Sequence, residues 1–392
     1  MITQLKNMEC YAPAALGKVD VLISGGSIAA MAAGIDIHGS AVQVVDAPDC
    51  LVVPGFVDSL AHIIGGGGEG GFRSRTSELR VDDAIRAGVT TLVGVLGTDA
   101  VTRTLSNLLA KARALDEEGL TCFCHTGSYQ IPARTLMRDV MEDLVLIDKF
   151  IGVGEVAIAD HRSSQPSPDE IKKLASQARV GGMLAGKAGI VSVHVGAASA
   201  GVALLEQVVA ESDIPISQFY PTHMNRNQRL LEQGFGFVQQ GGYIDFTTST
   251  TAQELASGEI KCSRALKLAL ENSVDVNNIT FSSDANASLP LFDERNAFIG
   301  LGEGRIASLF EEVVDAVKLE GIALETALRV ITCNPAAILK LPRKGQLRVG
   351  SDADLLLLDR DSLRIRAVMA GGRWLYAEPE LSLPVTRTSL FI

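Results

Sequence analysis

The middle of the chain alternates between short apolar runs and helical patterns, and this alternation restricts its fold more than any other feature. Eight runs have the length and composition of strands, at residues 56–59, 91–96, 121–125, 150–157, 190–194, 217–223, 243–247 and 278–284. Between them, apolar residues recur three and four positions apart, as in amphipathic helices, at residues 106–118, 169–185, 202–211 and 263–272. Eight strands alternating with helices over roughly 280 residues favour a closed, parallel (β/α)₈ barrel, a TIM-like α/β fold, over an open sheet.

Both ends of the chain are rich in strand patterns. The predicted strands cover residues 19–24, 27–33 and 41–45 near the start, and 353–358, 363–369 and 373–376 near the end. Glycine and aspartate turn signals separate them. We therefore expect the two termini to form one small β-sandwich domain from residues 1–53 and 344–392, with the barrel at 54–343 between them.

Composition limits the class of protein. Of the 392 residues, 47% are hydrophobic and 21% charged, so we expect a large folded core. The net charge of −11 argues against nucleic-acid binding, which needs clustered Lys and Arg. No apolar run is long enough to cross a bilayer, residues 1–14 lack the apolar stretch of a signal peptide, and six cysteines do not suggest a disulfide scaffold. We expect a cytoplasmic protein without nucleic-acid or membrane partners.

Residues that bind metals stand at the ends of several predicted barrel strands. They are His62, Glu155, His194, His223 and Asp284, on or just beyond strands one, four, five, six and eight. The carboxyl ends of parallel barrel strands converge on one mouth, so these side chains are expected to meet there. Imidazoles and carboxylates suit zinc and related divalent ions, and the sequence therefore predicts a site for one or two such ions.

A metal site of this composition suits hydrolysis of an amide. A metal-bound water ionises near neutral pH and supplies a nucleophile. Glu155 could bridge two ions, and Asp284 could both bind metal and carry a proton to the leaving amine. A single strand histidine is usually a core residue, but three at strand ends favour a shared metal. His125 stays ambiguous, because strand alternation puts it on the face opposite Cys122 and Cys124, which we interpret as packing residues.

Other polar residues near the predicted mouth suggest ligand contacts. Gly65–Gly68 could form a flexible loop or a backbone segment packed tightly against a ligand. Arg162 and Arg226 follow strands four and six and could clamp a carboxylate, although surface arginines are usually solvated. Tyr129 could donate to a developing oxyanion.

Specific motifs give the chain a resemblance to a known family. The frame Pro54-Gly55-Phe56-Val57-Asp58 and the late segment Gly350-Ser351-Asp352-Ala353-Asp354 resemble the amidohydrolase superfamily. Within it, the chain is similar to the isoaspartyl (β-aspartyl) dipeptidases. The narrower resemblance lies in residues 62–69, Gly97-Thr98-Asp99, 126–129, Asp160-His161-Arg162, 222–227 and 282–288, and it runs nearly end to end.

The resemblance implies a role for each site residue. His62 and Asp284 would hold one metal, His194 and His223 the other, and Glu155 stands where many members have a bridging carboxylated lysine. The residues implied to bind substrate are Glu69 for its α-amino group, Thr98 and Ser288 for its aspartyl end, and Arg162 and Arg226 for the carboxylate of the leaving residue. Tyr129 would polarise the scissile carbonyl.

One departure from the family pattern concerns the first strand. Members end it with a His-x-His pair, whereas this chain has Leu60-Ala61-His62. Leucine has no lone pair to offer, so one metal position has lost a ligand. Ala287 also replaces a glycine that is usual in the family before the serine corresponding to Ser288.

We therefore predict a zinc metallo-dipeptidase that hydrolyses β-aspartyl dipeptides with a metal-activated water and forms a homo-oligomer. Two alternatives remain open at this point. One is another cyclic-amide or N-acyl amino-acid hydrolase, against which Glu69 and the two arginines argue. The other is a catalytically weakened relative that binds an acidic dipeptide-like ligand, which the leucine at position 60 favours.

Overall fold

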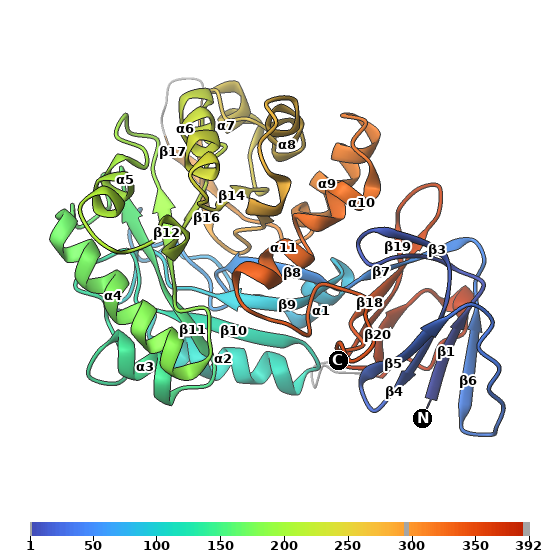
Figure 1. Ribbon diagram of the computed structural model, residues 1–392. Helices are drawn as coiled ribbons and strands as arrows, with labels where there is room; N and C mark the ends of the chain where they lie inside the picture. Colours follow the sequence, from blue (N-terminus) through green and yellow to red (C-terminus); the bar gives the residue numbers. More distant parts are fainter. Residues whose placement is uncertain (1, 294–297, 387–392) are drawn as a thin grey trace.

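The computed structural model describes residues 2–293 and 298–386, and its centre is a barrel of parallel strands (Figure 1). Six strands form one hydrogen-bonded sheet in sequential order: β8 (Phe56–Ala61), β9 (Val89–Gly94), β10 (Thr121–Thr126), β11 (Phe150–Ile158), β12 (Ile190–Val195) and β13 (Phe219–Thr222). Two more, β14 (Ile244–Thr247) and β15 (Ile279–Ser282), form a parallel pair. Within the described residues, these eight match the eight strands that the sequence predicts, with ends that differ by a few residues.

Backbone hydrogen bonds close the ring at both edges of the strand pair. The amide of Met224 donates to the carbonyl of Asp245 at 3.1 Å, which joins the end of β13 to β14. The amide of Asp284 donates to Leu60 O at 3.1 Å, and that of His62 donates to Ala285 O at 2.8 Å, which join the end of β15 to β8. The predicted barrel is thereby confirmed.

Helices surround the strands on the outside (Figure 1). Their bounds are α1 (Val81–Arg86), α2 (Leu105–Glu117), α3 (Val140–Leu146), α4 (Pro168–Ala185), α5 (Ala203–Ala210), α6 (Gln228–Gln239), α7 (Ala252–Ala256), α8 (Cys262–Glu271), α9 (Ser308–Lys318), α10 (Leu324–Arg329) and α11 (Cys333–Ile338), with short 3₁₀ turns η1 (Ile216–Gln218), η2 (Val276–Asn278) and η3 (Pro379–Leu381). Helix α4 shows why the ends are sharp. Ser167 and Glu170 form a capping box at its start, and Gly186 adopts the left-handed conformation at its end.

The two chain ends form a small domain of two sheets beside the barrel (Figure 1). One sheet has the order β5-β4-β1-β6, from β5 (Ser27–Ala32), β4 (Asp20–Ser24), β1 (Ile2–Lys6) and β6 (Val42–Asp46). The other has the order β20-β19-β18-β7-β2-β3, from β20 (Arg373–Ala377), β19 (Ile365–Ala370), β18 (Leu355–Asp359), β7 (Cys50–Pro54), β2 (Glu9–Tyr11) and β3 (Ala15–Lys18). The second sheet mixes strands from both termini, as expected for a shared sandwich. We keep the division at 53/54 and 343/344 as a proposal.

Apolar side chains fill the barrel at the amino-terminal ends of its strands, so the carboxyl-terminal ends are left for a site. The filling layer comes from β8, β9, β11, β12 and β13, namely Val57, Val93, Ile151, Ile190 and Tyr220. After β15, the chain forms an antiparallel hairpin of β16 (Ser288–Phe292) and β17 (Phe298–Glu303). The sequence patterns did not predict this hairpin. Within the described residues, no helix is both long enough and apolar enough to span a membrane.

Candidate metal centre

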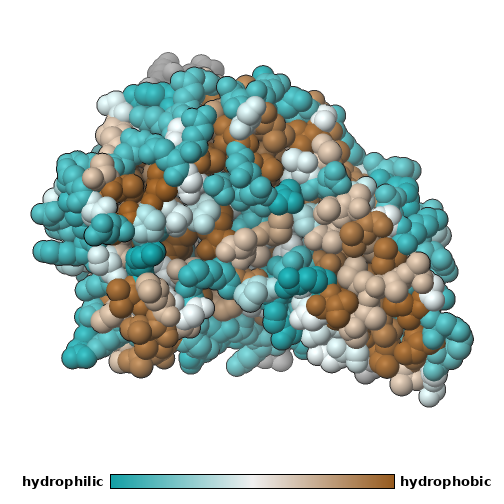
Figure 2. Space-filling view, in the orientation of Figure 1, coloured by the Kyte–Doolittle hydropathy of each residue, from teal (hydrophilic) through white to brown (hydrophobic). Residues whose placement is uncertain are grey.

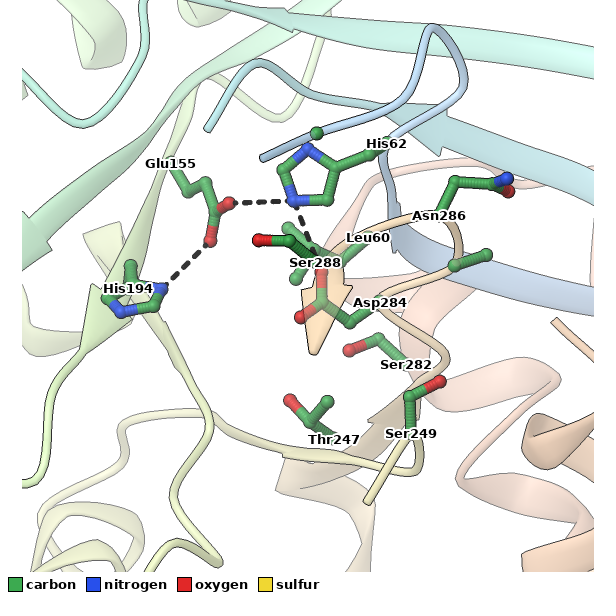
Figure 3. A network of polar contacts seen from close by, with 12 residues as sticks. Leu60, His62, Glu155, His194, Thr247, Ser249, Ser282, Asp284, Asn286 and Ser288 are labelled. Carbon is green, nitrogen blue, oxygen red and sulfur yellow. Dashed lines mark ion pairs between the residues drawn. The ribbon is translucent and has the colours of Figure 1, made fainter. Parts of the chain in front are cut away.

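The barrel brings all five predicted metal-binding side chains to one end. His62 directly follows β8, Glu155 lies within β11, His194 is near the end of β12, His223 directly follows β13, and Asp284 lies two residues beyond β15. Four of the five residues are buried, and the side chain of Asp284 is 13% exposed. Figure 3 shows Glu155 between His62 on one side and His194 on the other. The strand-end pattern thus predicted a real cluster.

Three of these side chains form the tighter group. Nδ1 of His194 lies 3.4 Å from Glu155 Oε2, and Nε2 of His223 lies 3.7 Å from the same oxygen. One donor atom from each of the three residues lies within 4.8 Å of the other two. Two imidazole nitrogens and a carboxylate oxygen around one small volume are the donor set that zinc and its neighbours bind.

The other two side chains form a second group around the opposite oxygen of Glu155. Nε2 of His62 lies 3.3 Å from Glu155 Oε1 and 3.2 Å from Asp284 Oδ1. Leu60 is 2% exposed and lies beside this group, where it contributes only apolar surface (Figure 3). This half of the cluster therefore has two nitrogen or oxygen donors of its own and shares the third.

Charge interactions hold the cluster in a defined protonation state. Burial raises the pKa of Glu155, but its contacts with His194, His223 and His62 outweigh burial and hold that pKa well below its ordinary value. Burial disfavours the charged form of His62, yet contacts with Asp284 and Glu155 raise its pKa to about 10. For His223, burial and the nearby Arg226 lower the pKa to about 4, so its imidazole is neutral. A neutral imidazole and an ionised carboxylate are the forms that bind metal, so Glu155 and His223 already have the metal-binding form, whereas an ion beside His62 would have to displace one of its two protons.

Several buried polar atoms in the cluster lack a hydrogen-bond partner within the described part of the chain. They are both carboxylate oxygens of Glu155, Oδ1 of Asp284 and Nδ1 of His62. A buried carboxylate oxygen without a donor is costly, and proteins normally pair such atoms or use them for metal. The donor chemistry and these unpaired oxygens both fit a bound divalent cation.

Neighbouring hydroxyl groups fix the two histidines of the tighter group. Thr247 Oγ1 lies 2.5 Å from Nδ1 of His223, which leaves Nε2 facing Glu155. Tyr129 Oη lies 2.8 Å from Nδ1 of His194. A backbone contact shapes the other group, because a Cβ on Gly97 would lie 2.8 Å from Cε1 of His62. Only glycine leaves room for the ring at that point.

A cavity of about 390 Å³ opens over the cluster and contains the predicted substrate-binding residues. Glu69, Thr98, Arg162, Arg226 and Ser288 all line it, together with Tyr129. Glu69 is the centre of a small network: it accepts from Thr98 Oγ1 at 2.8 Å, from Arg162 at 3.3 Å and from Ser288 Oγ at 3.4 Å. These side chains come from loops far apart in the sequence.

The two arginines differ in how they are held. Arg162 pairs with Glu69 and with Asp160 and is partly buried. Arg226 makes no ion pair with any carboxylate among the described residues, and its Nε is buried without a hydrogen-bond partner. A guanidinium that faces a cavity without an ion-pair partner is suited to bind an anion.

Three interpretations from the sequence can be compared with the structure. The glycine loop 65–68 is held against neighbouring backbone: a Cβ on Gly67 would lie 2.4 Å from Ser74 O, and one on Gly65 would lie 2.5 Å from Thr76 O. Its tightness therefore reflects packing against residues 74–77. Cys124 is buried beside α2, as expected for a packing residue. His125 is fully buried, neither ring nitrogen has a hydrogen-bond partner within the described residues, and burial lowers its pKa to about 4.

One residue of the site was quoted in a motif but received no role from the sequence. The carboxylate of Asp160 contacts both the guanidinium of Arg162 and the imidazole of His194. Its position two residues after β11 and two before Arg162 was the available signal. Side-chain direction in a turn does not follow strand or helix periodicity, so the contact with His194 could not be predicted.

Comparison with known proteins gives consistent matches over most of the chain. The amidohydrolase family profile matches residues 51–375. A structure of the β-aspartyl dipeptidase of Fervidobacterium islandicum AW-1 in complex with the β-Asp-Leu dipeptide is 42% identical, with a TM-score of 0.90 and 96% of each chain covered. A second structure of this dipeptidase is 40% identical, with a TM-score of 0.88 and coverage of 96% of this chain and 97% of the other. An allantoinase of Enterococcus faecalis is 26% identical over 86% of this chain and 82% of its own.

Proposed function

The chain belongs to the amidohydrolase family and, within it, to the β-aspartyl dipeptidases, and on this premise we propose that it hydrolyses β-aspartyl dipeptides. The observation that supports this function best is that His194 and His223 line the cavity while the buried carboxylate of Glu155 contacts both of them. A carboxylate, Glu69, and a guanidinium without an ion pair among the described residues, Arg226, line the same cavity. A dipeptide carries the complementary ammonium and carboxylate groups.

Glu155, His194 and His223 would hold one zinc ion tightly, and His62 and Asp284 would complete a second, weaker position with Glu155. A divalent ion in such a site lowers the pKa of a coordinated water and supplies hydroxide at neutral pH. The second position is weaker because Leu60 offers no donor atom there. We therefore propose a stoichiometry close to one zinc per chain.

The cavity residues would bind the two ends of the substrate. Glu69 would accept hydrogen bonds from the α-ammonium group, and its pKa is lowered: burial opposes ionisation, but Thr98 and Arg162 outweigh it. Thr98 and Ser288 would hold the aspartyl end beside Glu69. Arg226 and Arg162 would bind the carboxylate of the leaving residue. The free protein pairs Arg162 with Glu69, so a zwitterionic substrate replaces an existing ion pair.

Tyr129 and Asp284 would act on the scissile amide. Burial raises the pKa of Tyr129 well above its ordinary value, so the hydroxyl stays protonated and can donate to the carbonyl oxygen as negative charge develops there. Burial opposes ionisation of Asp284, but the contact with His62 outweighs it and lowers its pKa. The carboxylate can therefore accept a proton from the attacking water and return it to the leaving amine.

The test combines metal content with substrate choice on one preparation. Protein purified without chelator is expected to contain about one zinc per chain and to cleave β-aspartyl-leucine, but not α-aspartyl-leucine, N-acetyl-leucine or hydantoin. Arg226→Met is expected to raise KM for the dipeptide at least tenfold, because a charged hydrogen bond contributes about 1.5–3 kcal/mol. Arg229→Met is the matched control, since Arg229 lies on α6 and donates to Ala197 O.

The outcomes separate the alternatives. Preferential cleavage of hydantoin or N-acetyl-leucine would favour a different amidohydrolase. Affinity for the dipeptide without bound metal or turnover would favour a weakened, ligand-binding relative, for which the leucine at position 60 is the specific reason.

Two further proposals concern assembly and location. Exposed apolar side chains lie on α3 and α4, including Leu146 (63% exposed) and Leu184 (69% exposed), and Figure 2 shows hydrophobic residues over this part of the surface. They support a homo-oligomer, which light scattering would contradict by returning a mass of 41.5 kDa. The six cysteines are free thiols, which suits a cytoplasmic location.

A further inference from the structure

Asp160 contacts both a proposed metal ligand and a proposed substrate-binding arginine. Its side chain is 6% exposed, and Oδ2 lies 3.0 Å from Nε2 of His194. The same oxygen accepts from an Nη atom of Arg162 at 2.8 Å, and Oδ1 accepts from Arg162 Nε at 3.0 Å. The backbone amide of Arg162 also donates to Oδ1 at 2.8 Å. Both carboxylate oxygens are thus used for positioning other groups.

The contact with His194 selects one tautomer of the imidazole. A carboxylate oxygen can only accept here, so Nε2 must carry the proton, and Nδ1 keeps its lone pair. Nδ1 is the nitrogen that lies 3.4 Å from Glu155 and faces the metal centre, and without a bound ion its lone pair accepts from Tyr129 Oη at 2.8 Å. Arg162 also lies 3.3 Å from Nε2, and without Asp160 its N–H could donate there and stabilise the opposite tautomer, which cannot bind metal through Nδ1.

The contact with Arg162 fixes the direction of its guanidinium. Asp160 engages Nε and one Nη in a two-point pair, so the other Nη is left to reach Glu69 at 3.3 Å. Two parallel hydrogen bonds restrict a planar guanidinium far more than one does. When a substrate ammonium takes over Glu69, Asp160 is the contact that keeps Arg162 in the cavity.

We propose that Asp160 is a positioning residue that couples the metal ligand His194 to the substrate-binding arm Arg162. One carboxylate holds the imidazole in its metal-binding tautomer and the guanidinium in its carboxylate-binding direction. The substrate part of this proposal rests on the proposed function. The metal part does not, because it concerns zinc affinity alone.

The first test measures zinc affinity by titrating the zinc-loaded protein with a chelator of known affinity. Asp160→Ala is expected to raise the Kd for Zn²⁺ about 10- to 100-fold, the usual loss when the partner of a metal-bound histidine is removed. Asp160→Asn keeps the shape and one acceptor, so we expect a smaller rise, about threefold to tenfold. Asp143→Asn is the matched control: Asp143 is also a buried carboxylate, but its partners are Thr126, Leu136 and Met137.

The second test separates the substrate arm from the metal. With zinc saturating, Asp160→Asn is expected to raise KM for β-aspartyl-leucine severalfold, but to leave KM unchanged for β-aspartyl-leucinamide, which has no carboxylate for Arg162 to bind. A structural defect alone would raise both values equally.

Folded Asp160→Ala protein with the wild-type Kd for Zn²⁺ overturns the proposal, and if that variant does not fold, Asp160→Asn with wild-type Kd and wild-type KM does so. Absence of dipeptide cleavage by the unmodified protein would reject the proposed function, while the zinc titration would still test Asp160 against His194.

Discussion

The two halves of the metal cluster are built from the same kinds of residue but differ in completeness. On one side, Glu155, His194 and His223 bring three donor atoms together. On the other, His62 and Asp284 face Glu155, and Leu60 occupies the place of the remaining donor. The buried side chain of Leu60 fills the space on this side of the cluster but offers no atom that can bind a metal.

The surroundings of the two halves differ as well. Asp160 contacts Nε2 of His194 and Thr247 contacts Nδ1 of His223, so each ring is oriented through the nitrogen that does not face Glu155. For His62, Nδ1 has no hydrogen-bond partner within the described residues, and its ring is oriented by the carboxylates and by Gly97. Metal ligands are normally oriented by a second layer of hydrogen bonds. The half that contains Glu155, His194 and His223 is therefore the one organised to hold an ion by itself.

Removing a ligand from the group of Glu155, His194 and His223 is expected to change zinc content and activity more than any other substitution considered. His223→Ala removes one of three donors, and we expect bound zinc to fall below about 0.1 per chain and kcat/KM to drop about 10³-fold, since a catalytic metal supplies several kcal/mol. His62→Ala is the matched variant on the other side and is expected to keep close to one zinc. Metal analysis after gel filtration checks both. Equal zinc loss in the two variants would contradict the asymmetry.

Restoring the missing donor is expected to remove the asymmetry. Leu60→His places an imidazole beside His62 and Asp284, and we expect the zinc content to rise from about one to about two per chain. When a chelator removes the metal, the free energy of unfolding of the variant should be about 1–3 kcal/mol lower than that of the natural protein. The reason is that the new imidazole is then buried without a partner. Zinc should reverse that loss.

Leu60→Met is the control, since methionine is similar in volume but is a poor zinc ligand. It should bind as much zinc as the natural protein. If Leu60→His also binds only one zinc per chain, position 60 does not face a second metal.

The barrel could be predicted because its signal repeats. Each strand is a short apolar run between helical patterns, and the closed ring follows from their number and order. The helix and strand ends shifted by a few residues, as with β13, where the start of the predicted run forms the 3₁₀ turn η1. The hairpin β16–β17 was missed because Pro290 and two glycines, Gly300 and Gly302, weaken its strand pattern.

The position of the site could be predicted, but not all of its contacts. Strand ends converge by geometry, so His194 and His223 were expected to be neighbours before any distance was known. The pairing of Arg162 with Asp160, and the hydroxyl contact to His223 from Thr247, depend on loop conformation. Such contacts have no sequence period, and only coordinates reveal them.

The smallest expected effect concerns two buried carboxyl groups, one beneath each half of the cluster. Asp245 accepts from the hydroxyls of Thr222 and Thr280, below His223, and burial raises its pKa from 3.8 to about 7. Asp58 accepts from the amide of Ser283 and from that of Leu60, and burial raises its pKa from 3.8 to about 6. Both groups therefore keep their proton to a higher pH in the folded protein than in the unfolded chain.

The sign of the pH effect follows from proton binding. Between pH 3.8 and the raised pKa, the folded protein holds a proton that the unfolded chain has lost, so each group lowers the free energy of unfolding by about 1.4 kcal/mol per pH unit as the pH rises. Asp245→Asn and Asp58→Asn remove this loss, so each variant should gain stability relative to the natural protein as the pH rises from 4 to 6. From pH 6 to 7 only the Asp245→Asn difference should keep growing, because its pKa is the higher one.

Urea unfolding in EDTA at pH 4.5, 6 and 7.5 measures these differences without any contribution from metal. Asp361→Asn, which changes an exposed carboxyl group, is the control for the change of side chain. A flat difference for Asp245→Asn would mean that this carboxyl is ionised in the folded protein at the same pH as in the unfolded chain. The hydroxyls of Thr222 and Thr280 would then compensate its charge fully, and the complete half of the cluster would rest on an ionised rather than a protonated base.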